Sequence, residues 1–151
     1  MTALRRPDVT VTGIDLWRSV DQSGNNAAAA IDNAVANGVA DRVHFDTGDM
    51  TALPYPDGSF RLVLASMAIH NIPTRDGRRK ALAEAVRVLT ADGSILIADI
   101  QRTTEYRADL IAAGLAVTGP ARLGWRGWWS GPWLATTAIT ATRAGTNADE
   151  A

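Results

Sequence analysis

The sequence contains no cysteine and only one lysine among its 151 residues. The absence of cysteine excludes disulfide bonds, thiolate metal ligands and a cysteine nucleophile. Basic and acidic side chains number 15 and 16, and the resulting net charge of −1 argues against the polybasic surface of a protein that binds nucleic acid or acidic membranes. We therefore expect a globular protein with no nucleic-acid partner.

Other features are equally scarce. No stretch approaches the roughly 20 consecutive apolar residues that a membrane-spanning helix needs, and the first seven residues lack the apolar core of a secretory signal. We therefore expect a cytoplasmic protein. His44 and His70 are the only histidines, and because a metal site needs several converging ligands, we expect no metal.

What the sequence does contain is an alternation of strand-like and helix-like segments. β-branched and apolar runs predict strands at residues 9–15, 42–47, 60–65 and 94–99, from 115, and at 134–142, whereas helical periodicity predicts helices at residues 26–37, 75–89 and 103–113. The middle strands are apolar on both faces, which is typical of a parallel sheet covered by helices. We predict a single domain over residues 1–143 and a disordered tail over 144–151.

Polar side chains stand where four of these strands end, namely Asp15, Asp49, Ser66 and Asp99. In open parallel sheets, ligands bind beyond the carboxyl ends of the strands. An acid at the end of a strand can accept both hydroxyls of a ribose, as Asp15 would, and a carboxylate such as Asp49 can accept from an adenine amino group. Strand ends are also polar in proteins that bind nothing there, so a purely structural role stays open.

These residues belong to a longer series of motifs in a fixed order. The motifs are Val11-Thr12-Gly13-Ile14-Asp15-Leu16, Ala40-Asp41-Arg42-Val43, Gly48-Asp49-Met50 with Leu53-Pro54-Tyr55-Pro56-Asp57-Gly58-Ser59-Phe60, residues 65–72, and Glu84-Ala85-Val86-Arg87-Val88-Leu89 through Asp92-Gly93. In order and spacing they resemble the class I S-adenosylmethionine-dependent methyltransferases, in particular their type 11 domain. The resemblance covers residues 9–100 well and the last third of the chain loosely.

The resemblance implies a Rossmann-like, three-layer α/β fold with a mostly parallel sheet and an antiparallel last strand. It also implies that S-adenosylmethionine is the cofactor. By position, Asp15 would bind the ribose, Asp49 the adenine edge, and Ser66 would lie beside the sulfonium. The implied cofactor-binding residues are Asp15, Leu16, Trp17, Gly48, Asp49, Met50, Ser66 and Met67.

The chain departs from the family at its start. The family opens with a strand, a glycine-rich loop and a helix, yet nothing before Val9 resembles that unit, and none of the thirteen glycines forms a G-x-G pair. We therefore expect the first β-α unit to be missing. Its loss would leave a neighbouring strand unpaired and an apolar face uncovered, so a partner or a second copy could cover the exposed edge of the sheet.

The candidate acceptor site follows the strand that ends near residue 65. Histidine ionises near neutral pH, so His70 is the candidate general base, and Asp99 and Tyr106 are weaker candidates. A pocket for a small-molecule acceptor would use His70, Asn71, Trp125, Trp128 and Trp129. The tryptophans could instead pack on the sheet as a hairpin or contact a membrane.

Several readings of the whole chain compete. It could be an inactive or mis-started fragment of a methyltransferase, or an interaction module that uses the tryptophan-rich segment. A nicotinamide-dependent oxidoreductase would share Asp15 but lacks support, because the sequence has neither G-x-G-x-x-G nor Tyr-x-x-x-Lys. Arg75, Arg78 and Arg79 predict a solvated helix face, or otherwise a site for an anionic substrate.

Overall fold

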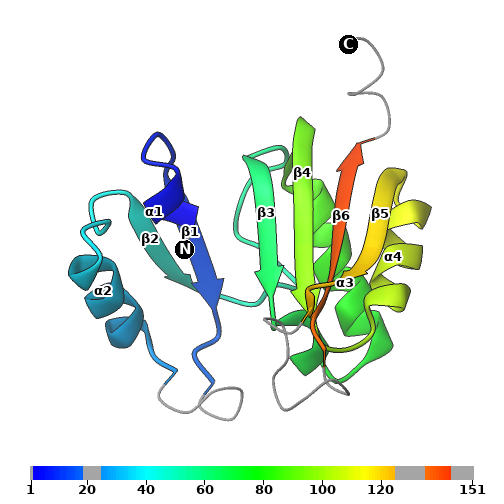
Figure 1. Cartoon of the computed structure of the whole chain (residues 1–151), viewed down its shortest axis with the longest axis horizontal. Coiled ribbons are helices and arrows are strands. Elements are labelled where there is room, and N and C mark those ends of the chain that lie inside the picture. Colours follow the sequence, from blue (N-terminus) through cyan, green and yellow to red (C-terminus); the bar gives the residue numbers. More distant parts are fainter. Residues whose placement is uncertain (1, 19–24, 125–134, 144–151) are drawn as a thin grey trace. The chain divides into compact units, whose positions relative to one another are not determined.

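The computed structural model describes residues 2–18, 25–124 and 135–143. The chain forms two compact units, Met1–Met50 and Thr51–Ala151, and each unit has its own sheet (Figure 1). The predicted tail at 144–151 and the predicted tryptophan contacts lie outside the described residues.

The first unit is a two-stranded parallel sheet with a helix packed on it. Its elements are α1 (Thr2–Arg5), β1 (Val11–Asp15), α2 (Ala27–Ala36) and β2 (Val43–Thr47). Ala34 of α2 and Val39 form a small core with Ala3, and Val11, Val43 and Phe45 of the two strands pack against it. Asn26 begins α2 by accepting a hydrogen bond from the Ala29 N–H, which satisfies one of the unpaired donors at a helix start.

The second unit contains a four-stranded sheet in the order β3-β4-β6-β5. Its elements are β3 (Phe60–Ser66), the 3-10 helix η1 (Ile69–Asn71), α3 (Arg75–Arg87), β4 (Leu89–Asp99), α4 (Thr103–Ala112), β5 (Leu115–Arg122) and β6 (Thr137–Arg143). β3 and β4 are parallel, whereas β6 runs antiparallel to both of its neighbours. The predicted mixture of parallel strands with an antiparallel last strand is thereby confirmed.

One predicted boundary is wrong. A strand was expected over residues 94–99, but β4 already begins at Leu89 and runs through Asp92 and Gly93, whose residue types favour a turn. Phe60 pairs with Leu89 and Leu62 pairs with Ser94, so the extra residues of β4 are accommodated as a bulge. Leu89 is almost completely buried, and burial of this side chain favours continuing the strand where local turn propensity alone predicts a break.

The arginine side chains at the start of α3 differ in their burial. Arg79 is exposed, as expected, but the expectation is wrong for Arg78, whose side chain is only 3% exposed. Arg78 donates to both carboxylate oxygens of Glu105 in α4 and to the carbonyls of Ile72 and Pro73. Its guanidinium therefore joins the start of α3 to α4 instead of forming a solvated face.

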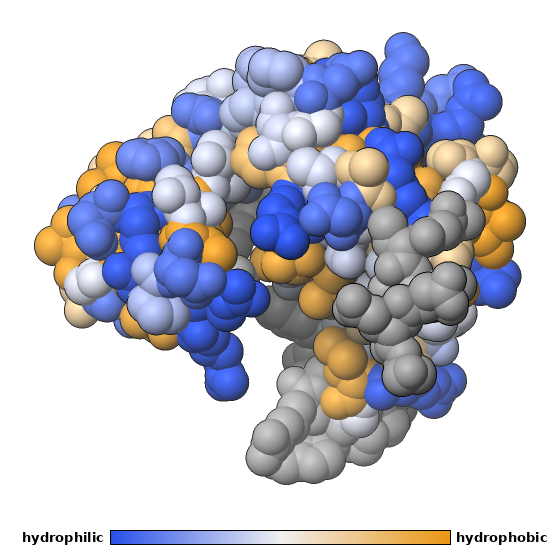
Figure 2. All heavy atoms as spheres, turned by 90° about the horizontal axis from the view of Figure 1, so that it is seen from above, coloured by the Kyte–Doolittle hydropathy of each residue, from blue (hydrophilic) through white to orange (hydrophobic). Residues whose placement is uncertain are grey.

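The two faces of the four-stranded sheet differ in their cover. Helices α3 and α4 lie on one face (Figure 1), where Ile95, Ile97 and Ile139 are each 1% exposed. On the other face, Leu64 of β3 pairs with Leu96 of β4, and both remain well exposed. Hydrophobic patches also lie between hydrophilic side chains on the surface seen from above (Figure 2).

Two of the strands lie at edges of their sheets. Among the described residues, β3 pairs only with β4 and β1 pairs only with β2. Each of these strands therefore presents one unpaired row of backbone donors and acceptors, which is a template for another strand. That a partner or a second copy covers such an edge stays a prediction.

The exposed leucines of β3 predict a contrast between two kinds of substitution. We expect Leu62→Thr with Leu64→Thr to reduce binding of an apolar fluorescent dye while changing the free energy of unfolding little, because both leucines are about half exposed. Ile97→Thr should cost about 2 kcal/mol or more, because it removes apolar contacts and buries a hydroxyl. Urea unfolding checks both variants, and equal destabilisation by the two changes would contradict this assignment of the faces.

The arginine run predicts a second contrast, between Arg78→Met and Arg79→Met. The hydrogen bond from Arg78 lowers the pKa of Glu105, so the pair stabilises the fold above the ordinary pKa of a glutamate and loses this effect as the pH falls through the lowered value. Losing Arg78 would leave Glu105 with only its longer ion pair to Arg75, at 3.5 Å, and would leave two carbonyls without this donor. At pH 7 we expect Arg78→Met to lower the thermal midpoint several times more than Arg79→Met, and in acid the difference should shrink.

Candidate functional site

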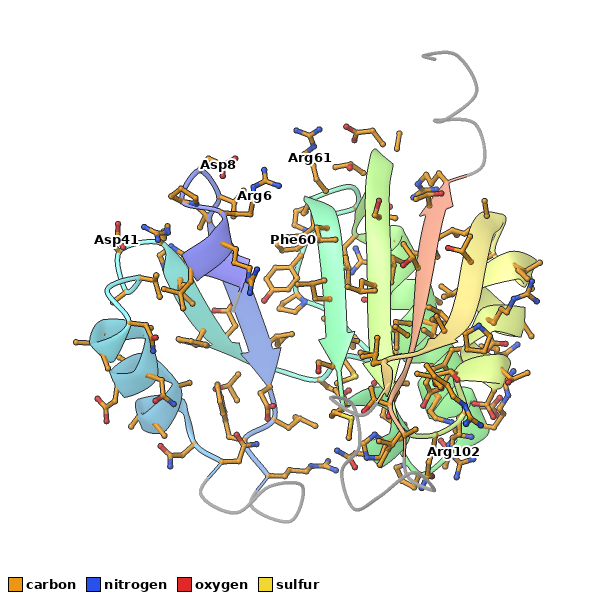
Figure 3. All side chains as sticks on the ribbon, viewed as in Figure 1. Arg6, Asp8, Asp41, Phe60, Arg61 and Arg102 are labelled. Carbon is orange, nitrogen blue, oxygen red and sulfur yellow. The ribbon has the colours of Figure 1, made fainter. Side chains whose placement is uncertain are left out.

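The chain leaves three of its parallel strands through strained turns. Among the described residues, all the non-glycine positions with positive φ follow strand ends, with φ of 54° at Trp17 after β1, 54° at Met67 after β3 and 62° at Arg102 after β4. Arg102 and Arg61 lie at opposite ends of the sheet of the second unit (Figure 3). Left-handed backbone in bulky residues costs free energy and is concentrated at functional sites. The carboxyl ends of these strands are therefore the first place to look for a site.

Asp15 ends β1, and only one of its two carboxylate oxygens accepts hydrogen bonds from the described residues. Its Oδ1 accepts from the backbone N–H of Trp17 at 2.6 Å and from the Asn25 side-chain amide at 3.2 Å. Among the described residues, Oδ2 has no hydrogen-bond partner. Asn25 is a contact that sequence reasoning missed, because no local pattern pairs it with an acid ten residues earlier. The two bonds fix the carboxylate and leave Oδ2 able to accept from a ligand.

The Trp17 side chain is held against the end of β2. Its indole N–H donates to Thr47 Oγ1 at 2.9 Å, and its ring meets Phe45 edge to face with centroids 6.3 Å apart. Thr47 was not predicted as a neighbour of the site, although the parallel register places it opposite Asp15. The indole, which the resemblance assigned to the cofactor, thus contacts the neighbouring strand.

Gly48 follows β2 directly and lies under an apolar side chain. A Cβ at this position would be 2.7 Å from Ile14 Cδ1, so only glycine fits without movement. The Gly48 N–H also donates to the Asp15 carbonyl at 3.0 Å, which carries the pairing of the two strands one step further. Asp49 and Met50 follow at this end of the unit. Gly48 therefore has a packing role whether or not it also lies beside a ligand.

In the second unit, the end of β3 leads directly to the predicted acceptor residues. Ser66 pairs with Ala98 of β4, and the Met67 N–H donates to the Ala98 carbonyl at 2.9 Å before the chain turns into η1. Ser66 and Asn71 are exposed, and His70 lies between them along the chain. The structure thus brings His70 and the end of β4 to the same edge of the sheet.

His70 contacts a completely buried carboxylate. Asp99 Oδ1 lies 2.6 Å from His70 Nδ1, and Asp99 Oδ2 accepts from the backbone N–H of His70 at 3.2 Å. Asp99 Oδ1 also accepts from the Ile100 N–H at 2.8 Å. The sequence identified both residues but gave no reason to join them, because their contact depends on the pairing of β3 with β4.

A buried phenol belongs to the same surroundings. Tyr106 of α4 is 0% exposed, and its hydroxyl has no hydrogen-bond partner within the described part of the chain. Burial raises the pKa of the Tyr106 phenol, and the negative charge of Asp99 raises it further. Tyr106 is therefore a neutral neighbour of the carboxylate at physiological pH.

Two further features of the structure bear on function. Among the described residues, no group of three or more His, Asp or Glu side chains is arranged to hold a metal ion. No helix in the same residues is long and apolar enough to cross a membrane. Trp125, Trp128 and Trp129 lie outside the described residues, so their predicted place in an acceptor pocket stays a prediction.

Comparison with known proteins identifies the family of the chain. A family model described as a methyltransferase domain matches residues 1–97. The chain belongs to this family. Methyltransferase GfsG of Streptomyces halstedii is 32% identical over 78% of this chain and 40% of its own length. The 27-O-demethylrifamycin SV methyltransferase of Amycolatopsis mediterranei is 37% identical over 61% of this chain and 30% of its own length.

Solved structures confirm the fold of the methyltransferase family. An O-methyltransferase family protein from Burkholderia thailandensis superposes with a TM-score of 0.73 at 18% identity, covering 93% of this chain and 46% of that one. The [4+2]-cyclase SpnF gives a TM-score of 0.69 at 19% identity, covering 94% of this chain and 70% of that one. Since one of these neighbours is described as a cyclase, the fold alone does not fix the reaction. The chain spans less than half the length of the two curated relatives.

The packing of Gly48 gives a prediction about the end of β2. We expect Gly48→Ala to destabilise the first unit by about 1–3 kcal/mol, because the new methyl group meets Ile14 Cδ1. Adding Ile14→Val removes that methyl group and should recover part of the loss, so the double variant should be more stable than the sum of the single changes predicts. Purely additive effects in chemical unfolding would contradict the packing argument.

Proposed function

We propose that this chain takes part in S-adenosylmethionine-dependent methyl transfer to a small-molecule acceptor. The observation that carries the proposal is the Asp15 carboxylate, which ends β1 with Oδ1 fixed by the Trp17 N–H and Oδ2 without a partner among the described residues. Membership of the methyltransferase domain family supports the same cofactor. When bound, S-adenosylmethionine supplies a methyl group on a positively charged sulfur, which is activated for transfer.

The residues of the first unit fit the nucleoside half of this cofactor. A ribose presents two neighbouring hydroxyl donors, and a carboxylate with an unused oxygen at a strand end is a suitable acceptor for them. In the proposal, Asp15 holds the ribose, and Leu16 and Trp17 lie beside the adenine. Asp49 and the backbone of Met50 hold the adenine edge, next to the close packing at Gly48. The sequence contains no G-x-G loop to line the methionine half.

The residues of the second unit suit the acceptor side of the reaction. Ser66 and Met67 end β3 at a strained turn, and the exposed Asn71 and part of the His70 ring follow directly. Methyl transfer from a sulfonium is an in-line displacement, so the protein mainly positions the two reactants and excludes water. The name of the rifamycin relative indicates O-methylation of a small molecule by that protein. This supports a small-molecule acceptor here.

Calorimetric titration with S-adenosylhomocysteine tests the proposal through Asp15→Asn. The amide keeps an oxygen for the Trp17 N–H but loses the charge and the second acceptor. Because a hydrogen bond to a charged group is worth about 1.5–3 kcal/mol, we expect the dissociation constant to rise about 10-fold or more. Asp32→Asn, an exposed acid on α2, is the matched control and should bind like the unmodified chain. Undiminished binding by Asp15→Asn would remove the ribose assignment.

A further inference from the structure

The two outer strands of the second unit's sheet differ in how they are protected against pairing. Among the described residues, β3 and β5 are the outer strands of this sheet (Figure 1). β5 contains Pro120, which has no N–H, and its register shifts between Thr118 and Ala121. β3 has no proline, and its pairing with β4 is unbroken from Leu62 to Ser66. Prolines and bulges keep edge strands from pairing with other chains, so β5 is protected and β3 is not.

Charge does not protect the edge of β3 either. Arg61 is the only charged residue of this strand and lies near its start. Its guanidinium is 3.2 Å from the carboxylate of Asp92, which belongs to β4 in the same sheet. Residues 62–66 are uncharged. A strand that approaches this edge therefore meets no row of like charges and has no charge to desolvate over these five positions.

The backbone groups of Leu62, Leu64 and Ser66 face the free edge. The Met67 N–H donates to the Ala98 carbonyl of β4, and successive residues of a strand direct their N–H and C=O groups to opposite sides. The side chains of the same three residues share the exposed face of the sheet, where Leu62 is 47% and Leu64 is 46% exposed. An added strand would therefore gain backbone hydrogen bonds and contact with two leucines.

We propose that the free edge of β3 pairs with the same edge of a second copy of this chain, in antiparallel orientation, with the twofold axis at Val63. In this register, Leu62 of each copy lies opposite Leu64 of the other. These residues face the edge, so they form the hydrogen-bonded pairs of the antiparallel ladder. The same patch is used by both copies, as a closed twofold dimer requires. The dimer does not depend on the methyl-transfer function proposed above.

A second copy fits this edge because the strand is complementary to itself. The pairs of Leu62 with Leu64 bring the leucines of both copies together on one face, beside Leu96 of β4, which is 38% exposed. Arg61 of each copy comes opposite Ala65 of the other, so the two guanidinium groups stay apart. A shift of the strands by two residues would keep only one leucine pair on the axis. Side-chain pairing and charge therefore favour one register of a homodimer.

Sedimentation equilibrium and amide hydrogen exchange of the whole chain test the dimer without any substitution. From low micromolar to near-millimolar concentration, we expect a monomer–dimer equilibrium, in which exchange of the Leu62 and Leu64 amides slows as the dimer forms. Exchange in β5 should not change with concentration. A monomer at every concentration would overturn the proposal. A monomer in which these two amides are already protected would also overturn it, because the edge would then be covered within one chain.

Charged substitutions on β3 test the register. Leu64→Glu and Leu62→Lys each place a charge opposite a leucine in both symmetric pairs, so we expect each to raise the dissociation constant of the dimer about 10-fold or more. Combined in one chain, the two changes place opposite charges across the axis and should recover most of that loss. Ile111→Glu, at a position on α4 that is 44% exposed, is the matched control and should leave the dimer unchanged.

Two results with these variants would contradict the pairing. A dimer that Leu64→Glu leaves intact would lie elsewhere on the molecule, and a double variant that dimerises no better than the single ones would exclude the register with its axis at Val63. Either result overturns the proposal. Circular dichroism checks that each variant is folded, and the exchange measurement on the unmodified chain decides the matter if one is not.

Discussion

Parallel pairing of β3 with β4 is the constraint on which the candidate acceptor site depends. The pairing runs to the last residues of both strands, so Ser66 lies opposite Ala98 and the Met67 N–H reaches the Ala98 carbonyl. The chain must then leave the sheet abruptly, and it does so through left-handed backbone at Met67 and, after β4, at Arg102. These turns bring η1 back over the end of β4, which places His70 on Asp99. A shift of the register by one residue would turn the Asp99 side chain to the other face.

The uneven cover of the sheet follows from the same pairing. Alternate residues of a strand point to opposite faces, so a strand that buries Ile95 and Ile97 under α3 and α4 must direct Leu96 the other way. Parallel strands are normally covered on both faces, and the continuous apolar runs at residues 62–65 of β3 and 95–98 of β4 fit that pattern. Leu62, Leu64 and Leu96 therefore keep the sequence pattern of a buried layer while remaining 38–47% exposed.

The sequence predicted well those features, such as helix starts and strand ends, that depend on residues close together along the chain. Helix starts at Asn26 and Thr74 were predictable, since each side chain caps the following N–H groups as its residue type favours. Strand ends at Asp15 and Asp99 were predictable from the change of apolar to polar residues. The burial of Arg78 was not, because its partner Glu105 lies 27 positions away on another helix. The glycine at position 48 was read as a ligand contact, whereas its fit against Ile14 follows only from the pairing of β1 with β2.

The two acids at strand ends show how similar sequence signals come to differ in chemistry. Each ends a parallel strand and each accepts a backbone N–H from the turn that follows, Asp15 from Trp17 and Asp99 from Ile100. Asp99 uses both oxygens within the protein and is completely buried, so a ligand does not reach it, and it contacts His70 instead. Asp15 is partly exposed and keeps Oδ2 without a partner among the described residues. The turn after each strand takes only Oδ1, so the difference lies at Oδ2, which accepts from the His70 N–H in Asp99 and has no partner among the described residues in Asp15. Burial and this long-range hydrogen bond separate the two acids, and the residue type in the sequence is the same for both.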